Sequence, residues 1–369
     1  MYKLKLTITF LILSISFSFS NSNELDKFKG FFDFSYDESK DKIFLEVDKL
    51  DYEFLYIGSL ASGIGSNDIG LDRGQLGLEK LVKFVKKGNK ILLVEPNLYY
   101  RAQTENISEK KSVEQAFAKS VIFGFEIVET NDEHYLIDFT PFLLYDRHGV
   151  AKRLRDLKQG SYKVDKSKSA IEIFNTKAFP ENIEFEALLT FSGEAKGSMI
   201  RSVAPDPDNV SVVQHHSFIK LPDNNYQPRK FDPRSGAISI SFMDYSTPID
   251  KPITKKFVIR HRLEKKNPEL EISEAVEPII YYLDPGTPEP VKSALLDGGR
   301  WWNQAYESIG FKDAFQVKML PEGAHPLDCR YNVIQWVHRS TRGWSYGASV
   351  VDPRTGEIIK GHVSLGSLR

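Results

Sequence analysis

Apolar and polar residues alternate in short runs along most of the first 265 residues, and turn-forming residues separate the runs. Residues 42–47 alternate apart from Phe44, and the charged segment 37–41 separates them from an aromatic run at residues 31–36. A period of two residues is typical of half-buried strands, and a polar break between two such runs predicts a hairpin. Other paired runs flank turn residues at 87–89 and 131–132. The pattern predicts a β-rich domain over residues 21–265.

Two segments of this first part break the alternation. Residues 112–120 predict one short helix, with Ser112 as its N-cap. The glycine-rich segment 58–77 predicts a structured loop, because glycine tolerates the positive φ angles that loops need. Within that loop we interpret Asp72 and Arg73 as a solvated surface turn, and contact with a partner is the alternative.

The pattern changes after residues 266–277, a charged segment without clear periodicity that we interpret as a linker. Residues 288–309 carry apolar side chains at three- and four-residue spacing, which predicts one long amphipathic helix. Trp301 and Trp302 are adjacent and cannot both face one core, so we expect one to be buried and the other to lie at an interface. Strands are expected around this helix, at residues 279–283, 315–319, 332–337, 347–351 and 357–365. The fold class expected for the whole chain is α+β.

Four sequences in the last part resemble a known family. They are IIYYLD at residues 279–284, LLDGGRWWN at 295–303, YNVIQWVHRS at 331–340 and GHVSLGS at 361–367. Together they resemble the first half of the catalytic domain in bacterial secreted zinc-dependent metalloproteases of the metzincin group. Members of that group carry a long N-terminal domain without assigned chemistry. The resemblance implies an incomplete metalloprotease domain at residues 278–369, zinc as cofactor and a peptide or protein as substrate.

The resemblance also implies a zinc-binding helix with the pattern HExxHxxGxxH/D, and none of the eight histidines has that spacing. His215 and His216 are adjacent, so on a strand they point to opposite faces and cannot bind one ion together. His338 and His362 fall on neighbouring predicted strands without an evident third ligand. We therefore expect no metal ligand and no catalytic residue in this chain, which would be inactive alone. The zinc ligands and the general base are expected beyond Arg369.

One part of the substrate site is expected within the chain. In the family that it resembles, the strand before the zinc helix lies at the sheet edge and pairs with the substrate backbone. Lys360, Gly361, His362 and Val363 are the candidate substrate-binding residues. Gly361 either admits a substrate backbone or marks a β-bulge, and both interpretations stay open.

Composition and the N-terminus bear on location and partners. The net charge is −1 without a basic block, which argues against nucleic acid as a partner. Residues 1–20 have the form of a signal peptide, with Lys3 and Lys5 before a short apolar stretch, so we expect export to the periplasm or beyond and no membrane span after cleavage. Cys329 is the only cysteine, which excludes an intramolecular disulfide and favours a buried structural thiol over a zinc-holding one.

These observations give one expected function and one rival. The chain is expected to be the N-terminal part of an exported zinc-dependent metalloendopeptidase. The rival is an exported protein that binds peptides or proteins without cleaving them.

Overall fold

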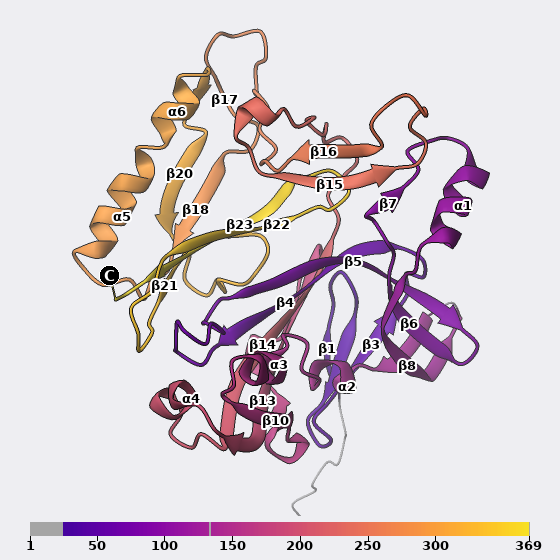
Figure 1. The fold of residues 1–369 in the computed structure, drawn as a ribbon, viewed down its shortest axis with the longest axis vertical. Coiled ribbons are helices and arrows are strands. Elements are labelled where there is room, and N and C mark those ends of the chain that lie inside the picture. Colours follow the sequence, from indigo (N-terminus) through magenta and orange to yellow (C-terminus); the bar gives the residue numbers. More distant parts are fainter. Residues whose placement is uncertain (1–24, 133, 369) are drawn as a thin grey trace, which may run out of the picture.

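The computed structural model describes residues 25–132 and 134–368. The signal peptide expected at residues 1–20 lies outside these ranges. Strands dominate the fold, which holds four separate sheets, the two largest lying side by side (Figure 1). None of the helices in the described ranges has the length and apolarity needed to cross a bilayer.

The largest sheet contains thirteen strands, all from residues 26–220, and we call it the N-terminal sheet. Its order is β1-β2-β3-β9-β8-β6-β5-β4-β14-β13-β10, and β11 and β12 also pair with β13. The bounds are β1 Asp26–Phe28, β2 Phe34–Asp37, β3 Lys42–Val47, β4 Glu53–Ser62, β5 Leu76–Lys87, β6 Lys90–Glu95, β8 Ser120–Asn131, β9 His134–Asp138, β10 Gly160–Val164, β11 Ala170–Ile171, β12 Lys177–Ala178, β13 Asn182–Ala195 and β14 Asn209–Lys220.

The predicted hairpins of the N-terminal sheet are confirmed. β2 pairs with β3, β5 with β6 and β8 with β9, each antiparallel. The helix expected at residues 112–120 is wrong in its bounds, because α1 covers Ile107–Ala116. Its cap is Asn106, whose side chain accepts hydrogen bonds from the amides of Ser108 and Glu109. Ser112 therefore lies inside the helix, and residue 120 begins β8.

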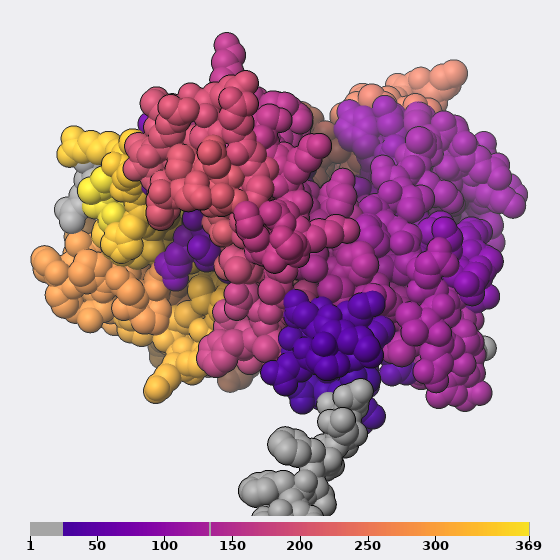
Figure 2. Space-filling model, turned by 90° about the horizontal axis from the view of Figure 1, so that it is seen from below, coloured from indigo at the N-terminus to yellow at the C-terminus, as the bar shows by residue number. Residues whose placement is uncertain are grey.

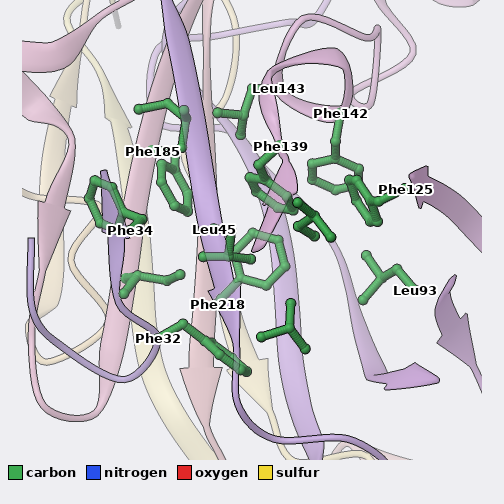
Figure 3. Packing of buried hydrophobic residues seen from close by; sticks show 14 of the residues in the cluster. Phe32, Phe34, Leu45, Leu93, Phe125, Phe139, Phe142, Leu143, Phe185 and Phe218 are labelled. Atoms are coloured by element: carbon green, nitrogen blue, oxygen red, sulfur yellow. The ribbon is translucent and has the colours of Figure 1, made fainter. Parts of the chain in front are cut away.

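One face of the N-terminal sheet encloses a core built mainly from phenylalanine rings (Figure 3). Phe139 lies 5.3 Å from Phe125 and 5.5 Å from Phe218 between ring centroids. Aromatic pairs at such distances add stabilisation beyond the apolar area that they bury. The short helix α2, Thr140–Leu143, contributes Phe142 to the same core.

Smaller elements complete this part of the chain. Two short helices, α3 at Val150–Asp156 and α4 at Ser198–Val203, pack on a second apolar cluster that includes Leu189 and Phe191 of β13. Three 3-10 turns cover Lys166–Lys168, Ile173–Asn175 and Pro233–Ser235. A separate three-stranded sheet has the order β16-β15-β7, with bounds Thr254–Val258, Ser239–Asp244 and Tyr100–Arg101.

The C-terminal sheet contains five strands in the order β20-β18-β21-β23-β22. The first three pairings are parallel, whereas β22 is antiparallel to β23. The bounds are β18 Ile279–Leu283, β20 Phe315–Met319, β21 Asn332–Val337, β22 Tyr346–Val351 and β23 Ile358–Gly366, close to the predicted strands. Before it, the expected linker includes β17, Ser273–Glu274, which pairs with β19, Phe311–Lys312.

The single long helix expected at residues 288–309 is observed as two helices. α5 covers Val291–Arg300 and α6 covers Asn303–Glu307, both beside the C-terminal sheet (Figure 1). A turn at Trp301 and Trp302 separates them. Both indole side chains are exposed, at 72% and 65%, so the expectation that one would be buried is wrong. Both tryptophans of the turn are thus largely exposed to solvent.

Two ion pairs join the glycine-rich loop of the N-terminal part to the C-terminal sheet. Asp72 pairs with Arg339 at 3.0 Å, and both side chains are buried. Arg73 pairs with Asp284 at 2.8 Å and also donates to the carbonyl oxygen of Trp336 at 3.1 Å. The interpretation as a solvated surface turn is therefore wrong for Asp72, which is buried, whereas Arg73 remains 44% exposed but forms an ion pair. Their partners lie more than 200 residues away in the sequence, where no local pattern reveals them.

We expect Arg339→Ala to lower the free energy of unfolding by about 3–5 kcal/mol, because it leaves the carboxylate of Asp72 buried without its partner. Urea denaturation followed by circular dichroism measures the change. Arg234→Ala is the matched control, since Arg234 pairs with Asp232 while 89% exposed. Equal stability of the two variants would contradict a buried junction.

Candidate functional site

The four residues predicted to bind substrate lie on β23, which is an interior strand. β23 pairs with β21 on one side, where His362 is opposite Val333, and with β22 on the other, where His362 is opposite Ala348. Lys360, Gly361, His362 and Val363 therefore have no free edge to offer a peptide backbone. The sequence could not show which of β22 and β23 lies at the edge of the sheet, because an edge strand and its neighbour carry similar apolar runs.

The side chain of Lys360 is also unavailable to a substrate. It is buried, and its ammonium group donates to the carbonyl oxygens of Pro326, Asp328 and Tyr331 at 2.9, 2.8 and 2.5 Å. Burial lowers the pKa of Lys360 to about 8. Its three bonds fix the segment between β20 and β21, which we call the 320–331 loop.

Gly361 is surrounded by residues of the C-terminal sheet. A Cβ at this position would lie 2.0 Å from the hydroxyl oxygen of Tyr281, and the Gly361 amide donates to the side chain of Asn332 at 2.6 Å. The missing side chain at Gly361 therefore makes room for Tyr281 and not for a substrate backbone. A register shift lies beside it, between the pairs formed by Val350 and Val351, so the bulged residue is Ile359.

The two edge strands of the C-terminal sheet are β20 and β22, and β22 is the one next to the predicted strand β23. In the described part of the chain this strand pairs only with β23. Gly347 and Ala348 are exposed, while Val350 and Val351 are buried. A Cβ added at Gly347 would meet no atom within 4 Å, so open space lies beside the strand there. This short edge is the place where an extended peptide can add a strand.

A second candidate site lies between the N-terminal sheet and the 320–331 loop. Glu184 and Glu186 project from one face of β13, and Glu186 is the direct cross-strand partner of His215 on β14. Nδ1 of His215 lies 3.0 Å from Oε1 of Glu186, and its Nε2 lies 2.7 Å from Oε2 of Glu184. His325 of the loop places its Nε2 3.2 Å from the same Oε1 of Glu186. We call these four residues the Glu–His cluster.

The Glu–His cluster is buried and strongly polarised. Burial alone would lower the pKa of His215, but hydrogen bonds to Glu184 and Glu186 outweigh it and raise that pKa to about 9. Burial alone would raise the pKa of Glu186, but the bonds from His215 and His325 hold it well below its usual range. The carboxylate of Glu186 is therefore held in its ionised form by the two imidazoles that contact it.

Glu184, Asp328 and Cys329 form a neighbouring group of potential metal ligands. Burial raises the pKa of the Cys329 thiol well above its ordinary value, and a protonated thiol is a poor ligand. Asp328 is also engaged, because it forms an ion pair with Arg330 at 2.6 Å. We therefore interpret this group as side chains in structural contact and not as a metal site. Cys329 is buried, as expected.

Comparison with known proteins identifies part of the chain. Residues 74–266 match the family described as a domain of unknown function, DUF5117, which spans slightly more than half of the chain. The chain belongs to this family. No curated protein and no solved structure matches it. The DUF5117 match assigns no activity and does not reach the residues that resemble metzincins.

The Glu–His cluster combines residues inside and outside the DUF5117 match. Glu184, Glu186 and His215 lie inside it, and His325 lies beyond it. The sequence analysis tested all eight histidines for the HExxH spacing, but it did not combine His325 with the strand residues. One signal was available, since Glu-x-Glu on one predicted strand and His-x-Ser on the next indicate a shared polar face. As expected, His216 points to the opposite face, where its Nδ1 lies 3.0 Å from the hydroxyl of Tyr56 in the aromatic core.

His338 and His362, the other pair of histidines considered in the sequence, do not join a cluster of potential ligands in the described residues. His338 is exposed and lies 3.1 Å from the hydroxyl of Ser367. His362 is 1% exposed, and burial together with the charges of Lys360 and Arg73 lowers its pKa to about 3. It is therefore neutral in the folded chain at any pH above that value.

We expect acid to destabilise the fold through His362. Below the ordinary histidine pKa of about 6.5, His362 is protonated in the unfolded chain but stays neutral in the folded chain. The free energy of unfolding therefore falls by about 1.4 kcal/mol for each pH unit. The loss continues until the pH reaches the folded pKa of about 3. His362→Gln removes this titration, so between pH 7 and pH 5 it should lose about 2 kcal/mol less than the unaltered chain.

Urea denaturation at both pH values measures this difference. His338→Gln serves as the control, because His338 is exposed and its substitution should leave the pH dependence unchanged. Parallel pH dependences for the His362 variant and the unaltered chain would contradict the buried, neutral imidazole.

Proposed function

We propose that this chain is part of an exported zinc-dependent metalloendopeptidase of the metzincin group, with the DUF5117 region as its accessory domain. The observation that supports the proposal best is the C-terminal sheet. Its elements follow the order that the sequence resemblance implies, with strand β18, then helices α5 and α6, then further strands. The sheet also ends in a strand with an exposed edge, which a peptide-cleaving enzyme of this type needs for its substrate.

In this proposal the zinc ligands and the general base come from residues beyond Arg369, because no HExxH sequence occurs between Met1 and Arg369. Zinc in such an enzyme polarises the peptide carbonyl and activates water. The residues of this chain bind and orient the substrate. β22 supplies backbone hydrogen bonds to an extended peptide, and Trp344, 68% exposed just before that strand, supplies apolar contact.

Binding without cleavage is the competing function, and the same edge of β22 supports it. An enzyme and a binding protein differ here in chemistry and not in the way they hold a peptide. Two measurements are therefore needed, one for peptide binding by β22 and one for hydrolysis.

We expect the chain to bind an extended peptide at β22. Successive amides of a strand point in opposite directions, so either Gly347→Pro or Ala348→Pro removes an outward N–H. Loss of one such hydrogen bond should weaken binding of a fluorescent casein peptide by about tenfold, measured by anisotropy. Gly347→Ala keeps the N–H and places its methyl in open space, so it should bind normally. Equal affinity of all three variants would exclude β22 as the binding edge.

Hydrolysis is tested on the product of the complete reading frame. That product should cleave unfolded casein, and a chelator should abolish the cleavage, whereas the 369-residue chain should cleave nothing. A complete product that binds casein through β22 but never cleaves it would favour the binding protein.

A further inference from the structure

The Glu–His cluster has no part in the proposed peptidase function. It lies on the polar face of β13 and β14 and joins the N-terminal sheet to the 320–331 loop. We propose that Glu186, His215 and His325 bind a divalent transition-metal ion of the zinc type, which clamps this loop to the N-terminal sheet.

The donor atoms already have the spacing of ligands around one ion. Oε1 of Glu186 lies 3.0 Å from Nδ1 of His215 and 3.2 Å from Nε2 of His325. Nitrogen and oxygen ligands about 2.0 Å from a tetrahedral zinc lie about 3.3 Å from each other. All three donor atoms fall within 4.8 Å of one another, so a small ion at their centre requires only minor shifts.

The donor types select zinc over calcium or magnesium. Two imidazoles and one carboxylate are a typical zinc set, whereas calcium and magnesium require mainly oxygen ligands. Glu184 adds the outer support that metal-binding histidines usually have, because it lies 2.7 Å from Nε2 of His215 and fixes the ring with Nδ1 toward Glu186. Asn175 supports Glu186 in the same way, by donating to its Oε2 at 2.8 Å.

An ion can reach the cluster from solvent. A cavity of about 610 Å³ lies beside it, and its walls include His215, His325 and Tyr331. His325 retains 31% of its side-chain exposure, whereas His215 and Glu186 are nearly inaccessible. The loop histidine is thus the ligand at the entrance, and the two strand residues form the floor.

The surroundings favour a structural ion over a catalytic one. A hydrolytic site needs a free base near the bound water. Glu184 is the nearest carboxylate to His215, and it is already occupied by His215, Ser217 at 2.5 Å and Asn182 at 2.7 Å. With Glu184 occupied in this way, we assign the ion the role of connecting segments far apart in the sequence.

Without a metal ion, hydrogen bonds from the imidazole N–H groups to the carboxylates would hold the same side chains together. The amide of Leu327 donates to Nδ1 of His325 at 3.2 Å, which leaves the proton of the neutral ring on Nε2, facing Glu186. An ion that binds Nε2 of His325 moves this proton to Nδ1, so the ring gives up the Leu327 bond. An ion that binds Nδ1 of His215 releases to solvent the proton that this nitrogen shares with Glu186. A metal clamp and a proton-held network therefore predict different responses to added ion, and one titration separates them.

The test uses the purified chain, stripped of metal by a chelator and titrated with Co²⁺ alone. One equivalent should bind and give the visible absorption bands of a tetrahedral nitrogen and oxygen site, and Zn²⁺ should remove them. His325→Ala deletes the most exposed ligand, with little risk to the fold, and should weaken Co²⁺ binding at least tenfold. His134→Ala is the matched control, because His134 also contacts a glutamate, Glu46, on a neighbouring strand, while 51% exposed, and it should bind normally.

Thermal unfolding gives a second readout. Zn²⁺ should raise the melting temperature of the unaltered chain and of His134→Ala, and should leave that of His325→Ala unchanged. Absence of Co²⁺ bands in the unaltered chain, or normal bands in His325→Ala, would overturn the proposal in favour of the proton-held network. Neither result depends on peptidase activity, so this proposal and the proposed function succeed or fail separately.

Discussion

The alternation of faces along β13 and β14 is the constraint on which most of this structure depends. These two strands pair over eleven consecutive positions, from Asn182 opposite Ile219 to Ser192 opposite Asn209. Phe185, His216 and Phe218 thereby face the aromatic core, and Glu184, Glu186 and His215 face the other way. A slip of one residue would exchange the two sets and place two carboxylates among phenylalanine rings. The hydrophobic core and the Glu–His cluster are therefore specified by one register.

The parts of the fold that follow from local patterns could be predicted from the sequence, and those that follow from distant contacts could not. Residues 42–47 form β3 as predicted, and their burial alternates because one face of the strand packs on the core. The helix break at Trp301 and Trp302 was missed because apolar spacing continues across it. The order of β22 and β23 in the sheet was missed for a related reason, since both are apolar runs and only pairing decides which is the edge.

The candidate sites show the same division. Glu184, Glu186 and His215 occupy positions that strand periodicity predicts, yet His325 joins them from a loop 110 residues later. Asp72 and Arg73 likewise find their partners in the C-terminal sheet. Side chains of this kind are placed by the packing of one sheet against another, and Figure 2 shows how closely the last residues of the chain, in orange and yellow, lie against the segments that precede them. Sequence periodicity carries no information about such packing.

The anchoring of the 320–331 loop by Lys360 has a consequence for the order in which the chain assembles. The loop takes its shape from three carbonyl bonds to an ammonium group on β23, the last strand of the described residues. During synthesis the N-terminal sheet emerges first, well before that strand exists. The loop therefore cannot take its final shape beside Glu184 and Glu186 until β23 has been made, so carboxylates that the finished fold buries are open to water while the chain is still growing.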